Sequence, residues 1–394
     1  MIDRARNIPL QALPWDADTV RAAIDEIVSD ALTHFDGERF WPAHPLDNAK
    51  DGNSSFYIGA AGMIWGLDYL RRVGARAAEF DFGPVLTRLL ETTQAEMATY
   101  GDYATTGSFL FGDLGTALVV MRLSPTSAIA DLVYERAAAN ARLPVRELMW
   151  GTPGSMLACV HMAEMTGEAR WRALFAEQAE RLLGELEETA DGPLWTQDLY
   201  GQRSSYLGPV HGYAGNMIPL LRGWKWLADG QRQRITDATT RTLAVNAWRS
   251  EQGVTWHAGA RRDGPPYLCQ HCHGAPGMVT TFADAPFTSP DLESLLVEGG
   301  NFTWAAGPLA KGSNLCHGTG GNGYAFLKLH RRTARPIWLE HARAFAMAAI
   351  DQCRLARTEL GRGRYSMWTG DVGLAVYLWD CLTVKPYFPT IDVF

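Results

Sequence analysis

The chain has 394 residues, of which 47% are hydrophobic and 20% charged, a composition that indicates a globular protein with a large core and excludes a disordered one. The formal net charge of −7 and the scattered lysines and arginines exclude the basic patch by which proteins bind nucleic acids. No apolar stretch approaches the length of a membrane span, and the first residues lack the apolar region of an export signal. We therefore expect a cytoplasmic protein that binds neither membranes nor nucleic acid, with its six cysteines reduced or bound to metal.

Two kinds of helical segment alternate along the chain. Val20, Ile24, Ile27 and Ala31 recur at helical spacing with charged residues between them, which predicts a half-buried helix, and residues 171–186 repeat this pattern. Other segments are apolar on nearly every side, which predicts helices that are enclosed by protein. These apolar runs include residues 63–67, 116–121, 324–327 and 374–379.

A Gly-x-x-Gly element recurs seven times, and each copy comes directly before an apolar run. The mean period of about 52 residues is long enough for two helices. Seven helical hairpins predict an all-α fold, an α/α toroid with an inner and an outer ring, in which residues 1–394 form one domain. We expect the glycine turns to share one rim, with the N–H groups of the helix starts facing the central cavity. The first glycines of the copies are Gly59, Gly112, Gly151, Gly212, Gly274, Gly318 and Gly370.

Three successive copies carry histidine or cysteine directly before the first glycine. His211 lies in the fourth copy, Cys272 and His273 in the fifth, and Cys316 and His317 in the sixth. If the repeats are superimposable, these side chains converge on one sector of the rim. Two thiols and an imidazole are enough to hold a catalytic Zn²⁺ with one open coordination position.

These motifs resemble those of a known family. Residues 206–215 with their His-Gly, residues 271–277 with Cys-His-Gly, and residues 315–325 with a second Cys-His-Gly are similar to the motifs of lanthionine synthetase C-like proteins, and the match runs through all seven repeats. The residues of these motifs are closer to those of the stand-alone members, which in eukaryotes bind glutathione, than to those of dedicated lantibiotic cyclases. The resemblance implies an α/α toroid, a zinc site, and addition of a thiol, from glutathione or a peptide cysteine, to dehydroalanine or dehydrobutyrine in a peptide or protein.

The resemblance also implies roles for residues of the rim. By motif, Cys272, Cys316 and His317 would be the zinc ligands, and His211 would be a general acid/base near the metal. Glu147 lies four residues before its glycine, where the cyclases have an acidic residue.

A second group of residues would bind the thiol donor. Lys311, five residues before Cys316, is similar to the glutathione-contacting lysine of the stand-alone members. Arg4 falls where they place an N-terminal arginine. Arg364, with Arg362 close by, lies near another arginine of the family.

The chemistry of thiols explains why such a site needs a metal. A free thiol has a pKa near 8.5, so only a few per cent is thiolate at neutral pH. Two thiolates and a neutral imidazole leave a bound Zn²⁺ formally neutral overall, so an incoming third thiolate keeps its nucleophilicity. Addition to a dehydroamino acid then gives an enolate that needs a proton at its α-carbon, and the usual pKa of a histidine suits His211 to supply it.

Other interpretations stay open at this point. Cys269 forms a Cys-x-x-Cys with Cys272, and His271 stands where the family usually has tryptophan. If Cys269 were a fourth ligand, the zinc would be structural and the chain a glutathione- or peptide-binding protein. Fourteen tryptophans and many carboxylates also permit a toroidal glycoside hydrolase, although no carboxylate pair is tied to the glycine turns. A prenyltransferase-like toroid would need an acidic zinc ligand that has no visible counterpart.

Overall fold

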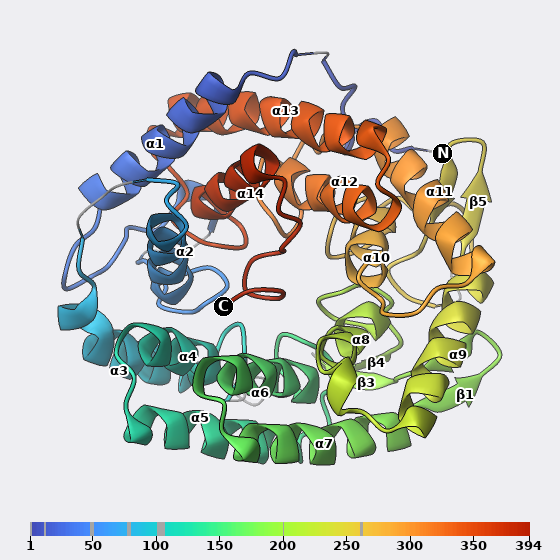
Figure 1. The fold of residues 1–394 in the computed structure, drawn as a ribbon. Helices are drawn as coiled ribbons and strands as arrows, with labels where there is room; N and C mark the ends of the chain where they lie inside the picture. Colours follow the sequence, from blue (N-terminus) through green and yellow to red (C-terminus); the bar gives the residue numbers. More distant parts are fainter. Residues whose placement is uncertain are drawn as a thin grey trace.

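Helices dominate the computed structural model, which describes residues 2–11, 13–47, 51–76, 80–100, 107–199, 201–260 and 263–394. Within these residues the chain forms fourteen α-helices in two concentric rings (Figure 1). Each of the seven inner helices begins directly after the first glycine of one Gly-x-x-Gly element and is buried over most of its length. The inner helices are α2 (Ala60–Arg72), α4 (Asp113–Leu123), α6 (Thr152–Thr166), α8 (Tyr213–Arg222), α10 (Ala275–Phe282), α12 (Thr319–Thr333) and α14 (Asp371–Thr383).

The outer helices are amphipathic and cover the inner ring. In the first of them the buried residues include Val20, Ile24, Ile27 and Ala31, so the predicted half-buried helix is confirmed. The outer helices are α1 (Ala17–Thr33), α3 (Leu86–Met97), α5 (Ser127–Asn140), α7 (Ala169–Gly184), α9 (Asp229–Val245), α11 (Pro290–Ala306) and α13 (Pro336–Leu360). Among the described residues, three short 3₁₀ helices lie in the connections: η1 (Pro45–Asp47), η2 (Gly83–Val85) and η4 (Trp224–Trp226).

The inner ring is closed. Each inner helix contacts the next one along the chain, and the last, α14, contacts the first, α2. The outer helix α1 also packs against α14, so the two ends of the helical sequence are joined. The predicted α/α toroid of seven helical hairpins is therefore confirmed.

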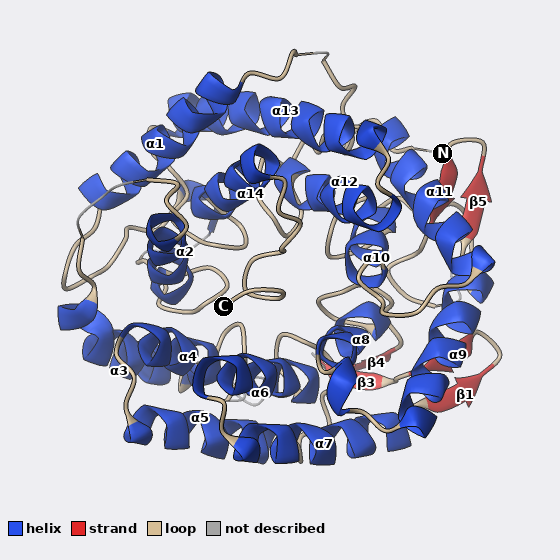
Figure 2. Cartoon of the chain, in the orientation of Figure 1, coloured by secondary structure: helices blue, strands red, loops and turns tan. Residues whose placement is uncertain are grey.

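In the part of the chain that the structure describes, three small β-hairpins lie outside the helices of the toroid (Figure 2). They are antiparallel pairs of three-residue strands in the connections from α7 to α8 and from α9 to α10. The glycine repeat does not predict them. The pairs are β1 (Glu187–Thr189) with β2 (Gly192–Leu194), β3 (Gln197–Leu199) with β4 (Gln202–Ser204), and β5 (Trp248–Ser250) with β6 (Gly253–Thr255).

The loops before the inner helices form a continuous rim. The residue two positions before each helix-starting glycine is joined to the neighbouring loop by a main-chain hydrogen bond in most repeats. Tyr57 N–H donates to Leu110 O at 2.9 Å, and Cys272 N–H donates to Cys316 O at 3.0 Å. Cys316 N–H in turn donates to Trp368 O at 2.8 Å. This chain of bonds sets the spacing between side chains of adjacent repeats.

The first N–H groups of several inner helices are hydrogen-bonded to carbonyl groups of the loops that precede them. In α12, the N–H groups of Thr319, Gly320 and Gly321 donate to carbonyl groups seven residues earlier, and α2 and α8 use the same pattern. The expectation that these N–H groups face the central cavity is therefore wrong for these three helices. At these loops, the groups that remain available to bind a metal or substrate are therefore side chains.

The segment after α14 enters the middle of the ring. Residues 384–394 turn back toward the centre (Figure 1), and Phe388 and Phe394 are buried there. Phe394 packs against Phe56, Trp65 and His161, with ring centroids 5.1 to 5.9 Å apart. The C-terminal segment thus fills part of the centre, beside a pocket of about 200 Å³ that it lines together with residues of α8, α10 and α12. Among the described residues, no helix is both long and apolar enough to cross a membrane.

Candidate metal and thiol site

The candidate site lies at equivalent positions of adjacent repeats. Cys272 and Cys316 both stand two residues before a helix-starting glycine, and His317 stands one residue before. The loops that carry them precede α10 and α12, which pack together. Because the main-chain bond between Cys272 and Cys316 links the two loops, their side chains are held next to each other.

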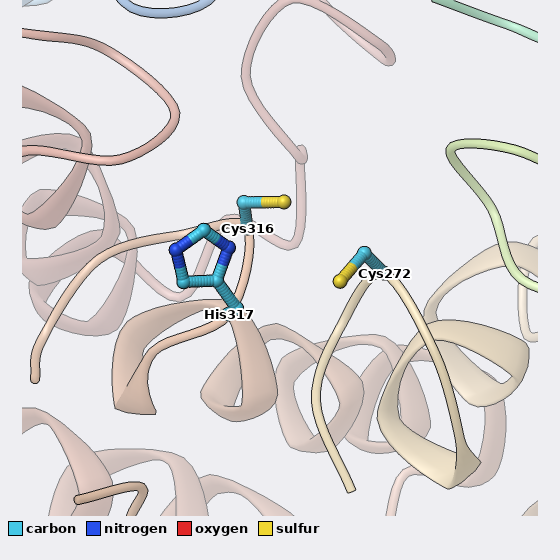
Figure 3. Close-up of side chains that lie close together, drawn as sticks. All are labelled: Cys272, Cys316 and His317. Atoms are coloured by element: carbon cyan, nitrogen blue, oxygen red, sulfur yellow. The ribbon is translucent and has the colours of Figure 1, made fainter. Parts of the chain in front are cut away.

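The structure brings the three expected zinc ligands into one cluster (Figure 3). The Sγ atoms of Cys272 and Cys316 and a ring nitrogen of His317 all lie within 4.8 Å of one another. Both cysteines are buried, whereas His317 is partly exposed. The cluster is therefore reachable from the rim at its histidine side.

Each cysteine sulfur also accepts a hydrogen bond from a side chain outside the cluster. The Tyr57 hydroxyl donates to Cys316 Sγ at 2.7 Å, and the Gln270 Nε2 amide donates to Cys272 Sγ at 3.0 Å. Burial, together with the neighbouring cysteines, raises the pKa of Tyr57 well above its ordinary value, so the phenol keeps the proton that it donates. Sequence reasoning missed both residues. The repeat could have identified Tyr57, because it stands two residues before Gly59 and so occupies the same repeat position as the two cysteines.

The two thiols share their protons unequally. A hydrogen bond from Cys316 lowers the pKa of Cys272 well below its ordinary value, against the opposing effect of burial and with help from His317. The same bond and burial raise the pKa of Cys316. The pair therefore favours one thiolate before any metal arrives, and a cation would favour two.

The donor set fits zinc. Thiolate sulfur and imidazole nitrogen are the usual zinc ligands at about 2.3 and 2.0 Å from the ion, so neighbouring ligand atoms around one ion lie roughly 3.5–4 Å apart. Mutual separations within 4.8 Å are close to this requirement. Three protein ligands are also the number found at catalytic zinc sites, which keep their fourth position for water or substrate.

Cys269 does not join this cluster within the described chain. Its thiol is buried and hydrogen-bonds with Thr303 of α11, and burial raises its pKa to about 12. His271 is also turned away: its ring stacks on Phe388 with centroids 4.3 Å apart, and burial lowers its pKa to about 4. The arrangement therefore gives no support to a fourth protein ligand at Cys269.

Glu147 and His211 form a pair on the neighbouring part of the rim. Glu147 Oε2 lies 2.9 Å from His211 Nδ1, and the carboxylate also accepts the N–H groups of Met149 and Trp150. Burial lowers the pKa of His211, but the hydrogen bond and charge of Glu147, with a contribution from Cys272, hold it above its ordinary value. Glu147 is fully buried while His211 is partly exposed. The pair thus presents an oriented imidazole toward the side of the rim that carries Cys272.

A cationic pocket borders the loop that carries Cys316 and His317. It has a volume of about 50 Å³, and Asn314, which lines it, accepts the N–H of His317 through its side chain at 3.0 Å. The pocket brings together Lys311, Arg362 and Arg364 from two loops that are about 50 residues apart in the sequence. Its full lining is His44, Leu46, Lys311, Gly312, Ser313, Asn314, Gln352, Cys353, Ala356, Arg357, Arg362, Arg364, Thr369 and Asp371.

The cations of this pocket differ in how far they are already paired. Arg364 binds the Asp47 carboxylate, and Arg362 donates to Ala43 O at 3.3 Å. Lys311 is exposed at the mouth of the pocket and is close enough to Cys316 for its charge to lower the pKa of that thiol. Lys311 is therefore the cation best placed to meet an incoming anion.

Arg4 lies outside this pocket. Its guanidinium donates to the carbonyl groups of Ala306 at 3.0 Å and Ala305 at 3.3 Å, at the end of α11. The N-terminal segment runs beside residues 308–310 through main-chain bonds, so Arg4 is near the loop of Lys311. Arg4 thus binds the C-terminal end of α11, and its expected contact with the thiol donor stays a prediction.

Comparisons with known proteins agree with these observations. The chain is 31% identical to the LanC-like protein GCL1 of Arabidopsis thaliana over 196 residues, which make up 48% of this chain and 43% of GCL1. It is 24% identical to the glutathione S-transferase LANCL1 of Danio rerio over 374 residues, with 88% of this chain and 87% of LANCL1 covered. Among solved structures, nisin cyclase shares the fold with a TM-score of 0.62 at 13% identity, covering 96% of this chain and 100% of the cyclase.

A family model described as lanthionine synthetase C-like protein matches residues 22–393. This match spans nearly the whole toroid, including all the loops that carry the candidate site. The chain therefore belongs to the lanthionine synthetase C-like family.

Proposed function

We propose that this protein is a zinc-dependent enzyme that adds a thiol, from glutathione or a peptide cysteine, to dehydroalanine or dehydrobutyrine and so forms a thioether. The observation that carries the proposal is the cluster of Cys272, Cys316 and His317, which offers three suitable ligand atoms at the rim. Membership of the family and the likeness to a protein named glutathione S-transferase support a reaction of thiols. When bound, a zinc ion would keep an incoming thiol deprotonated near neutral pH.

The cationic pocket supports a carboxylate-bearing thiol as the donor. Lys311 and Arg364 line it beside the ligand loop, and glutathione carries two carboxylates that cations of this kind bind. A donor held there by its carboxylates would have its sulfur directed toward Cys316 and His317. Positioning of this kind lowers the barrier because the reacting groups need not be brought together in the transition state.

The Glu147–His211 pair supplies the proton that the addition requires. The donor sulfur attacks the β-carbon of the dehydroamino acid, the carbon–sulfur bond forms as the carbon–carbon π bond breaks, and the electron pair moves to the α-carbon and its carbonyl group. His211 in its protonated form then gives a proton to the α-carbon. The proton of the original thiol goes to solvent, and the neutral imidazole takes a proton back from solvent. Glu147 acts through His211 because it orients the ring and favours the imidazolium.

Metal analysis and a product assay on the intact protein test the proposal. We expect one zinc per chain after purification, and a glutathione adduct when the protein is mixed with glutathione and a peptide that contains dehydroalanine. The adduct should be detected by mass spectrometry, with a zinc-free sample as the control. One zinc per chain without any adduct would favour a binding protein with structural zinc instead.

A further inference from the structure

The two cysteine sulfurs of the cluster accept hydrogen bonds from different side chains. Tyr57, in the loop before α2, donates its phenol to Cys316 Sγ, while Gln270 donates its amide to Cys272 Sγ. The cluster itself consists of Cys272, Cys316 and His317. Sulfur is a weak acceptor when it is a thiol and a stronger one when it is a thiolate, so these bonds gain strength once the cysteines are ionised.

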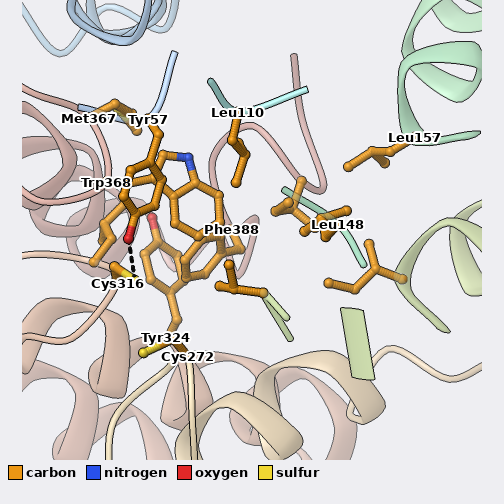
Figure 4. Close-up of a cluster of buried hydrophobic side chains, with 14 of the residues drawn as sticks. Tyr57, Leu110, Leu148, Leu157, Cys272, Cys316, Tyr324, Met367, Trp368 and Phe388 are labelled. Atoms are coloured by element: carbon orange, nitrogen blue, oxygen red, sulfur yellow. Dashed lines mark hydrogen bonds between the residues drawn. The ribbon is translucent and has the colours of Figure 1, made fainter. Parts of the chain in front are cut away.

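Tyr57 is held rigidly in this position (Figure 4). Its N–H donates to Leu110 O and its carbonyl accepts from Trp368 N–H, so the rim bonds fix its main chain on both sides. Its ring packs between Phe111 and Trp368, with centroids 5.3 and 5.7 Å away. The side chain is 8% exposed. A rigid buried donor aimed at a sulfur keeps its hydrogen bond without losing further side-chain entropy.

We propose that Tyr57 is a positioning residue of the thiol site: with Gln270, it donates a hydrogen bond to a ligand sulfur and withdraws negative charge from it, so that a third thiolate can join the cluster. This inference rests on the proposed zinc-dependent thiol addition. It assigns a role to a side chain of the first repeat that reaches the cluster formed by the fifth and sixth repeats.

The charges at the site make such donors useful. Two thiolates with one neutral imidazole balance a divalent cation, and a third thiolate leaves one uncompensated negative charge. Cys272 and Cys316 are buried, so water cannot fully stabilise that charge, and fixed hydrogen-bond donors must do so. Charge-assisted hydrogen bonds are roughly twice as strong as neutral ones. Donors to the ligand sulfurs therefore favour the state with the substrate thiolate present over the state without it.

The decisive variant is Tyr57→Phe, which removes one oxygen and keeps the ring between Phe111 and Trp368. We expect zinc affinity, measured by competition with a chelating dye, to fall about 10- to 100-fold, the range typical of lost partners of metal ligands. In the cobalt-substituted protein, the sulfur-to-cobalt absorption bands should shift. The KM for glutathione should rise about 10-fold while kcat changes less, because loss of the bond mainly disfavours entry of the third thiolate.

Tyr377→Phe is the matched control. Tyr377 is also fully buried, and its hydroxyl donates to Ala342 O at 2.6 Å, away from the cluster. This variant should lose a comparable part of its stability and leave zinc affinity, the cobalt bands and the KM unchanged. If Tyr57→Phe does not fold, Gln270→Met tests the second donor, and the same shifts are expected.

The outcomes separate this inference from the proposed function. A wild-type protein that holds no zinc, or that forms no adduct, would overturn the function. A wild-type protein that holds zinc and forms the adduct, with a Tyr57→Phe variant that matches Tyr377→Phe in zinc affinity and cobalt spectrum, would overturn the inference alone.

Discussion

Two arcs of the same rim differ in chemistry while sharing one backbone plan. At the position two residues before the glycine, the second to fourth repeats carry Leu110, Met149 and Val210, and the fifth and sixth carry Cys272 and Cys316. All five residues are buried, and main-chain bonds join the loops in both arcs. All five belong to the hydrophobic core, and only the two cysteines, which mark the cysteine arc, also belong to the ligand cluster. The repeat thus sets where a side chain stands, and the residue type decides whether the place is core or site.

Removing one ligand should have the largest effect. Cys316→Ala turns the sixth repeat into an apolar copy like the second, and we expect the zinc content to fall from one per chain to nearly none. Thiol addition should fall by more than the roughly 100-fold seen when only a partner of a ligand is lost. Metal analysis and the adduct assay measure both quantities.

The control is a cysteine that belongs to the core. Cys159 of α6 is fully buried, and burial alone raises the pKa of its thiol. Cys159→Ala should lower the free energy of unfolding by about 1 kcal/mol, a typical cost of trimming a core side chain, and keep the zinc. If Cys159→Ala loses its zinc and Cys316→Ala keeps it, Cys316 is not a zinc ligand.

The next effect concerns His211, the proposed proton donor, at the border of the two arcs. His211→Asn should lower kcat about 10²- to 10⁴-fold, the usual contribution of a general acid, and leave the zinc content unchanged. The pH profile gives a sharper test. The proposed acid is the protonated form of His211, so we expect activity to be retained below its pKa and lost as pH rises through it. Glu147 raises that pKa, so Glu147→Gln should move the alkaline limb of kcat to lower pH.

An alkaline limb that stays in place in Glu147→Gln would show that another group supplies the proton. The variant keeps the size of the buried side chain, but Met149 N–H and Trp150 N–H are accepted by different oxygens of Glu147, so the single amide oxygen keeps only one of these bonds. Circular dichroism and the zinc content serve as controls for the fold and the metal.

Much of the fold could be predicted from the sequence because each copy of the glycine repeat marks the start of an inner helix. Gly-x-x-Gly followed by an apolar run predicted the inner helices, and the alternating amphipathic segments predicted the outer ring. The cluster of Cys272, Cys316 and His317 followed from their shared places in the repeats. Tyr57 was missed because it is distant in the sequence, and only the closed ring brings the first repeat to the sixth. The use of Arg4 at the end of α11 was missed because main-chain acceptors leave no pattern in the sequence.

The glycines offer a way to disturb both arcs equally. A Cβ at Gly321 would lie 1.7 Å from Leu315 O, and one at Gly115 would lie 2.0 Å from Phe109 O. Gly321→Ala and Gly115→Ala should each lower the free energy of unfolding by about 1–3 kcal/mol, as measured by urea denaturation. Only Gly321→Ala should also weaken zinc binding, because its loop carries Cys316 and His317. Equal loss of zinc from both variants would show that the rim responds as one unit.

The smallest expected effect tests whether the donor pocket belongs to the cysteine arc. Lys311→Gln removes one positive charge at the pocket mouth, and the KM for glutathione should rise about 3- to 5-fold, since exposed charge pairs contribute up to about 1 kcal/mol. The effect should shrink in high salt and be absent for a thiol without carboxylates, such as 2-mercaptoethanol. Lys385→Gln is the control, because this exposed lysine follows the end of α14 at the opposite rim. If both variants raise the KM equally, the lysines act through the overall charge of the protein, and the pocket beside Cys316 has no special part in binding the donor.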